Sequence, residues 1–115
     1  MSPDPQAPPP DLTPGSFRLA ADGNGRLLAE GPLTFASARR ARELGLEAIA
    51  ARGGGALLID CQGIAASDSA GLAVLLDWLA VARAQGRSLR LVHLPQGLAA
   101  LGRISEVSEL LERGV

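Results

Sequence analysis

One segment most constrains the fold of this chain: a strand-like apolar run that leads through a short polar turn directly into an apolar helix pattern. Residues 56–61 are almost continuously apolar and of strand length, which is typical of a central strand covered by helices on at least one face. The turn at 67–71 reads Ser-Asp-Ser-Ala-Gly. Asp68 or Ser67 can cap the helix predicted over about 69–85, because a side-chain oxygen there accepts an unpaired backbone N–H. A short polar tip is therefore expected beside a hydrophobic helix.

The other elements follow an alternating α/β order. An Asp-Gly-Asn-Gly turn at 22–25 predicts an antiparallel hairpin. Thr34 is predicted to cap a helix that the glycines 53–55 end. The expected strands are residues 17–20, 26–30, 56–61 and 88–93, and the expected helices are 34–52, 69–85, 95–104 and 106–112. This order predicts an α/β fold with a mixed four-stranded sheet and helices packed mainly on one face.

The composition limits the functional classes. A chain of 115 residues that is 47% apolar and 20% charged can bury one core. A net charge of −1, two Phe, one Trp and no Tyr supply neither the charge nor the stacking rings of a nucleic-acid surface. One Cys and one His form neither an internal disulfide nor a zinc site, so we expect no metal and no cofactor. No apolar run approaches the about 20 residues of a membrane helix, and no signal peptide is recognisable, so a cytoplasmic protein is expected.

The N-terminal segment differs in composition from the rest. Six of the first 14 residues are proline, which predicts a disordered tail over residues 1–15 and a single folded domain over 16–115. Binding of this tail to an aromatic groove of a partner is the alternative to a plain solvated tail.

The element order, with Asp-Ser-Ala-Gly-Leu at 68–72, resembles the STAS family, named for sulfate transporters and anti-sigma-factor antagonists. The resemblance covers about residues 16–113 and implies the STAS-like (SpoIIAA-type) fold. Gly-Pro-Leu-Thr at 31–34 and Leu-Leu-Asp-Trp-Leu at 75–79 are most similar to the MlaB-like branch, the STAS subunits of phospholipid-transporting Mla ABC complexes. That similarity implies a non-enzymatic regulatory or assembly subunit in the maintenance of lipid asymmetry. Its partner would be the transporter ATPase, and it would lie peripheral to the inner membrane through the permease.

The resemblance also implies roles for the turn. In the anti-sigma-factor antagonists the phosphoacceptor directly precedes the motif glycine, and that position here is Ala70, which has no hydroxyl. Ser69 matches the hydroxyl that engages the ATPase in Mla-type subunits, so we predict a partner contact there; stabilisation of the helix start alone is the other reading. An antagonist switched by phosphorylation remains the alternative function, with Ser67 or Ser69 as a displaced acceptor.

Residues around Ser69 complete the predicted partner surface. Asp68 is expected to organise the turn, because an acidic group is favourable at a helix N-terminus. Ala70 and Gly71 are small enough to let a partner approach closely, or to pack against the sheet. Trp78 and Val74 fall towards the flank of the helix, where Trp78 would anchor a partner or cover the core. The stripe assigned to the core is Leu72, Leu75, Leu76, Leu79 and Ala82.

The remaining polar residues predict no catalytic site. Cys61 ends an apolar strand and is interpreted as a packed thiol, and His93 as a surface or half-buried residue without a second metal ligand. No general base stands near the serines of the turn, so we expect no enzyme. The basic patch on the first helix is either a solvated face or a contact for anionic lipid or an acidic partner; it consists of Arg39, Arg40 and Arg42. The sequence is also compatible with a homodimer of the isolated chain.

Overall fold

The computed structural model describes residues 16–51 and 55–115 and contains the expected four strands and four helices. The elements are β1 (Arg18–Ala21), β2 (Leu27–Leu33), α1 (Ala38–Ala51), β3 (Leu57–Ser67), α2 (Ser69–Ala84), β4 (Leu89–Val92), α3 (Gln96–Ile104) and α4 (Ser108–Arg113). The predicted α/β class and element order are confirmed. The predictions for the tail at 1–15 and for glycines 53 and 54 lie outside the described residues.

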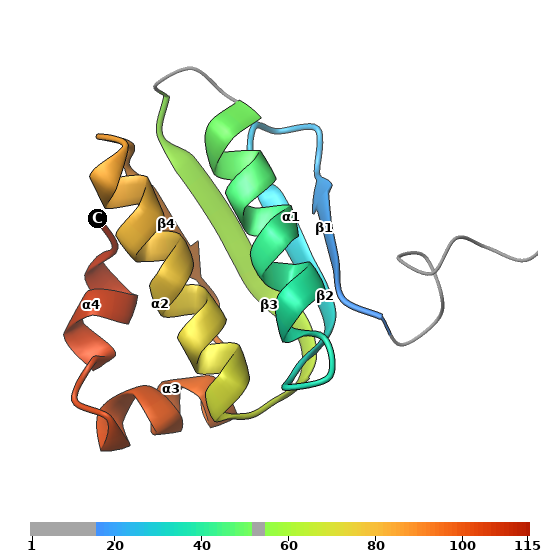
Figure 1. The fold of residues 1–115 in the computed structure, drawn as a ribbon, viewed down its shortest axis with the longest axis vertical. Helices are drawn as coiled ribbons and strands as arrows, with labels where there is room; N and C mark the ends of the chain where they lie inside the picture. Colours follow the sequence, from blue (N-terminus) through green and yellow to red (C-terminus); the bar gives the residue numbers. More distant parts are fainter. Residues whose placement is uncertain (1–15, 52–54) are drawn as a thin grey trace, which may run out of the picture.

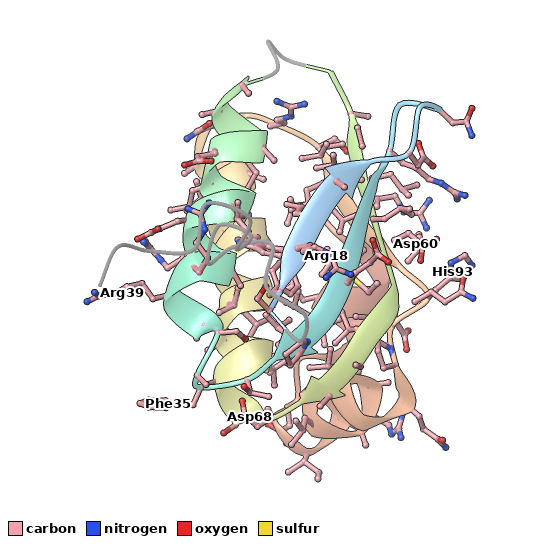
Figure 2. All side chains as sticks on the ribbon, turned by 90° about the vertical axis from the view of Figure 1, so that its right-hand side faces the viewer. Arg18, Phe35, Arg39, Asp60, Asp68 and His93 are labelled. Carbon is pink, nitrogen blue, oxygen red and sulfur yellow. The ribbon has the colours of Figure 1, made fainter. Side chains whose placement is uncertain are left out.

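The sheet is mixed, and its strands follow the chain in the order β1-β2-β3-β4. β1 pairs with β2 antiparallel, whereas β2 with β3 and β3 with β4 are parallel. Helices α1 and α2 lie side by side over one face of the sheet, and α3 and α4 follow near β4 (Figure 1). No helix of the described residues covers the opposite face of the sheet (Figure 2), which fits the prediction of helices packed mainly on one face.

Strand alternation directs the apolar residues of the sheet towards the helices. Trp78 of α2 is 0% exposed and lies at the centre of this layer. Its ring is 6.1 Å from that of Phe17, and its indole N–H donates to the carbonyl of Arg42 in α1 (3.4 Å). Gly45 makes this contact between the two helices feasible, because a Cβ there would lie 2.0 Å from the indole nitrogen. Helix α2 is thus held by the sheet on one side and by α1 on another.

The largest differences from the predicted boundaries are at the start of α1 and the end of β3, and β2 also runs to Leu33 instead of ending at residue 30. Helix α1 begins at Ala38, four residues after the predicted cap Thr34, because residues 34–37 form a turn in which the N–H of Ser37 donates to the carbonyl of Thr34 (3.0 Å). The Ser37 hydroxyl accepts from the N–H of Thr34 (3.0 Å) and donates to the carbonyl of Pro32 (2.8 Å). Strand β3 runs to Ser67, well past the predicted end at residue 61, because its pairing with β2 continues to the Leu33–Ser67 pair. Among the described residues no helix is long and apolar enough to cross a membrane.

Candidate functional site

The turn between β3 and α2 is organised by Asp68. Its backbone is extended, and its Oδ1 accepts from the N–H of Gly71 (3.0 Å), so it is the N-cap of α2, as predicted, and Ser67 is not. Its Oδ2 accepts from the N–H of Phe35 (3.0 Å) in the loop between β2 and α1. Donation from the Phe35 and Gly71 N–H groups holds the pKa of the Asp68 carboxyl below its usual value of 3.8. One carboxylate therefore fixes the start of α2 and a loop 33 residues earlier in the chain.

Beside this turn an open groove of about 530 Å³ lies between α1 and α2. It is mostly apolar, and Phe35 stands at its edge with 84% of its surface exposed. Figure 2 shows Phe35 and Arg39 projecting outward on the side where Asp68 lies. Ser69 is exposed next to Ala70, which lines the groove. The lining residues are Phe35, Ala38, Arg39, Arg42, Ala70, Ala73, Val74 and Asp77. Ser69, Ala70 and Val74, named from the sequence, therefore lie at or next to one surface.

The three arginines of the predicted basic patch differ in their ion pairs. Arg42 pairs with Asp77 of α2 and so bridges the two helices along the groove. Arg40 pairs with Glu43 on α1 (3.6 Å). Arg39 is exposed, lines the groove, and forms no ion pair with any residue that the structure describes. Its guanidinium is available to an acidic group of a partner.

Two of the predicted surface residues belong to the core instead. Trp78 is fully buried between α1 and the sheet, so it does not lie on the flank, and of its two predicted roles it covers the core instead of anchoring a partner. Gly71 is also buried, and a Cβ there would lie 2.1 Å from the carbonyl oxygen of Leu33, so this glycine serves the packing of α2 against β2. Val74 is 5% exposed and contributes only to the floor of the groove. Leu76, assigned to the core, is only half-buried.

Phe35 is the site residue that the sequence reasoning missed. Its only sequence signal is an aromatic side chain directly after Gly-Pro-Leu-Thr. Such a residue can equally be a core side chain at the start of a helix. The structure exposes it because the loop turns at Ser37 and is tied to Asp68.

The other candidate residues form no catalytic arrangement. Cys61 is fully buried, and burial raises the pKa of its thiol to about 12, which confirms a packed thiol. His93 is exposed on the helix-free face, and its Nδ1 lies 3.1 Å from Oδ1 of Asp60. The pKa of the buried Asp60 carboxyl is lowered mainly by the hydrogen bond from the N–H of Gln62, and to a smaller extent by His93. No group of three potential metal ligands occurs in the described part of the chain.

Comparisons with known proteins agree with the fold. The family model described as "Mlab, STAS domain" matches residues 17–112. A sulfate transporter family protein from Wolinella succinogenes has a similar crystal structure, with a TM-score of 0.61 and 17% identity over 84% of this chain and 77% of that one. The murine anion transporter Solute Carrier 26 family member A9, in its inward-facing state, matches with a TM-score of 0.53 and 18% identity over 82% of this chain. This chain spans only 18% of that transporter. At these identities the likeness is one of fold. No curated protein matched.

Proposed function

Because this chain belongs to the STAS domain family, in its MlaB-like branch, we propose that it is a non-enzymatic regulatory or assembly subunit that binds the ATPase of a phospholipid (Mla-type) ABC transporter. It would be held at the inner membrane indirectly, through the permease of that complex, and would take part in maintaining lipid asymmetry. A STAS fold also occurs in a sulfate transporter family protein and in an anion transporter. That occurrence supports a transporter-associated role in general.

One observation carries the proposal: Phe35 and Ser69 are both exposed next to Asp68, whose carboxylate accepts hydrogen bonds from the N–H groups of Phe35 and Gly71. Large aromatic side chains are enriched among residues that dominate binding free energy, provided that a partner encloses them. The apolar groove beside Phe35 accepts a side chain of the partner, and Arg39 at its edge accepts an acidic group. These are the features of a docking surface.

The same surface supports a role without chemistry. The only described potential base next to Ser69 is the Asp68 carboxylate, and both of its oxygens already accept from backbone N–H groups, those of Gly71 and Phe35. His93 pairs with Asp60 on the helix-free face of the sheet. A serine hydroxyl is a weak nucleophile unless a base activates it. We therefore assign Ser69 to partner contact.

The proposal is tested by purification of the tagged protein from its own cells, followed by mass spectrometry of what remains bound after a salt wash. We expect an ABC ATPase with its permease. A Ser69→Arg variant should lose both, because a long charged side chain then stands in the contact surface. Ala50→Arg is the matched control, since Ala50 is exposed on α1 at the end remote from the groove. Retention of the ATPase by Ser69→Arg, or recovery of no transporter subunit by the unmodified protein, contradicts the proposal.

The alternative, an anti-sigma-factor antagonist in a phosphorylation-controlled partner switch, has one observation in its favour. Ser69 presents an exposed hydroxyl at the start of α2, although Ala70 occupies the acceptor position of such antagonists. Recovery of a kinase-like anti-sigma factor, with a phosphate increment in the intact mass, would favour this function over transport.

A further inference from the structure

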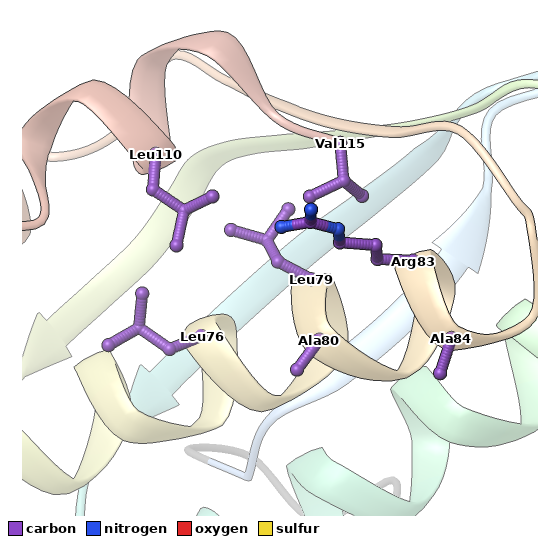
Figure 3. Close-up of a pocket in the computed structure, with 7 residues that line it drawn as sticks. All are labelled: Leu76, Leu79, Ala80, Arg83, Ala84, Leu110 and Val115. Atoms are coloured by element: carbon purple, nitrogen blue, oxygen red, sulfur yellow. The ribbon is translucent and has the colours of Figure 1, made fainter.

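A second groove lies on the side of α2 that faces α4. Its volume is about 480 Å³. Figure 3 shows Leu76 and Leu79 of α2 opposite Leu110 of α4 and Val115. Leu79 is fully buried and forms the floor, whereas the other three side chains are only half-buried. The described fold therefore leaves an apolar channel open beside its core.

Arg83 gives this groove a charge at one end. It lies in the last turn of α2, and its side chain extends over the groove towards Val115 (Figure 3). A cation at a helix C-terminus is favourable in itself, and an arginine stem commonly covers apolar surface while its charged head stays in water. Here this arrangement places an exposed guanidinium at one end of the apolar groove. Within residues 16–51 and 55–115, no acidic side chain lines the groove, and Arg83 forms no ion pair with an acidic side chain or with Val115.

We propose that this groove binds a single-chain anionic amphiphile, a long-chain carboxylate, with its chain along Leu76, Leu79 and Leu110 and its headgroup on Arg83. The planar guanidinium donates two parallel hydrogen bonds to a carboxylate. Apolar walls with one polar group that fixes orientation are typical of small-molecule sites, whose volumes are about 300–1,000 Å³.

The dimensions favour a small ligand over a protein segment. From Leu76 to Ala84 the groove follows α2 for about 12 Å at 1.5 Å per residue. A stable protein interface buries about 800 Å² on each partner, far more than a channel of this length offers. The site is separate from Phe35 and Ser69, so it stands or falls independently of ATPase binding.

The test is a titration of the ¹⁵N-labelled full chain with monomeric laurate, below its micelle concentration, followed by amide chemical shifts. We expect saturable shifts confined to the groove, above all at Leu76, Leu79, Leu110 and Val115. Dodecanol, which has the same chain length without the charge, should bind about tenfold or more weakly, because it lacks the charge-assisted hydrogen bonds. Arg83→Gln should weaken laurate binding to a similar extent, since glutamine keeps the helix propensity but not the charge.

A pair of matched variants separates the groove from the rest of the surface. Ala80→Glu places a carboxylate on the exposed rim of the groove and should abolish laurate binding by repulsion. Ala50→Glu makes the same change at an exposed position of α1 and should leave binding unchanged. Circular dichroism checks that all variants are folded.

Several outcomes overturn the site. They are the absence of saturable shifts, shifts that map outside the groove, and equal affinity of Arg83→Gln and the unmodified chain. A response to phosphatidylglycerol vesicles but not to monomeric laurate would assign the surface to a membrane instead. Protection of Leu110 from hydrogen exchange only in the ATPase complex would assign it to the partner protein.

Discussion

Replacement of Phe35 by alanine should weaken binding to the proposed partner, the transporter ATPase, at least about tenfold while leaving the stability of the free chain almost unchanged. Phe35 is 84% exposed, so its removal leaves no cavity in the core. Exposed substitutions of this kind change the free energy of unfolding by less than about 0.5 kcal/mol. The two effects are therefore separable in one variant.

The expected loss of affinity follows from the exposed surface. An aromatic side chain buries about 150–250 Å² when it is fully enclosed. At about 25 cal/mol per Å², enclosing the 84% that is now exposed is worth about 3–5 kcal/mol. Immobilising the side chain costs about 0.5–1.5 kcal/mol. A net loss of about 1.5 kcal/mol or more remains, and 1.4 kcal/mol corresponds to about tenfold in the dissociation constant.

The assay is calorimetric titration of the purified ATPase with the unmodified chain and with Phe35→Ala, together with urea unfolding of both. Ile104→Ala is the matched control, because Ile104 is 80% exposed but lies at the end of α3, outside the α1–α2 groove. We expect Ile104→Ala to bind normally. Equal affinities for Phe35→Ala and the unmodified chain, or equal losses in the two variants, would refute the assignment of the docking surface.

Three further predictions concern packing and titration. Gly45→Ala should destabilise the chain by about 1–3 kcal/mol, because the new Cβ would lie 2.0 Å from the Trp78 indole nitrogen; thermal unfolding measures the loss, and the fluorescence of this single tryptophan reports the displaced ring. Asp68→Ala should lower the urea midpoint at pH 7. Since folding lowers the Asp68 pKa, its contribution is complete above the usual value of 3.8 and vanishes as pH falls through the folded-state pKa, so the difference between the two proteins should shrink in acid. Cys61 should react with iodoacetamide at pH 9 only as fast as the chain unfolds, because burial raises its pKa to about 12; labelling that is fast and independent of urea would contradict this.

The periodicity of the sequence was sufficient for the elements, but not for the full environment of α2. An apolar stripe predicts one buried face of a helix, and Leu72, Leu75 and Leu79 do face the core. Helix α2 has a second neighbour, α1, which comes close only because Gly45 has no side chain. That contact buries Trp78, and no pattern within α2 itself predicts this burial.

The sequence predicts that a hydroxyl or carboxyl side chain stands near the start of a helix, but it identifies the particular capping residue only in part. Asp68 was identified as one of two caps because the helix pattern begins directly after it. Thr34 was predicted to cap α1, but its N–H and carbonyl take part in a turn with Ser37, and the helix begins only at Ala38. The Ser37 hydroxyl also donates to the carbonyl of Pro32, and no local sequence pattern predicts that bond. The exposure of Phe35 depends on a bond to a residue 33 positions away, which local sequence does not encode.

The double role of Asp68 links the packing of the fold to its proposed function. A subunit without chemistry influences its partner only by binding one conformation of that partner more tightly than another. This difference in affinity is largest when little of the binding free energy is lost in ordering the binding surface itself. Gly71 lets α2 approach the end of β2, and Asp68 then reaches Phe35 in the loop that follows that strand. The loop and the start of α2 consequently form one preorganised unit, so a substitution at Asp68 should weaken partner binding even though its carboxylate touches only the chain's own backbone.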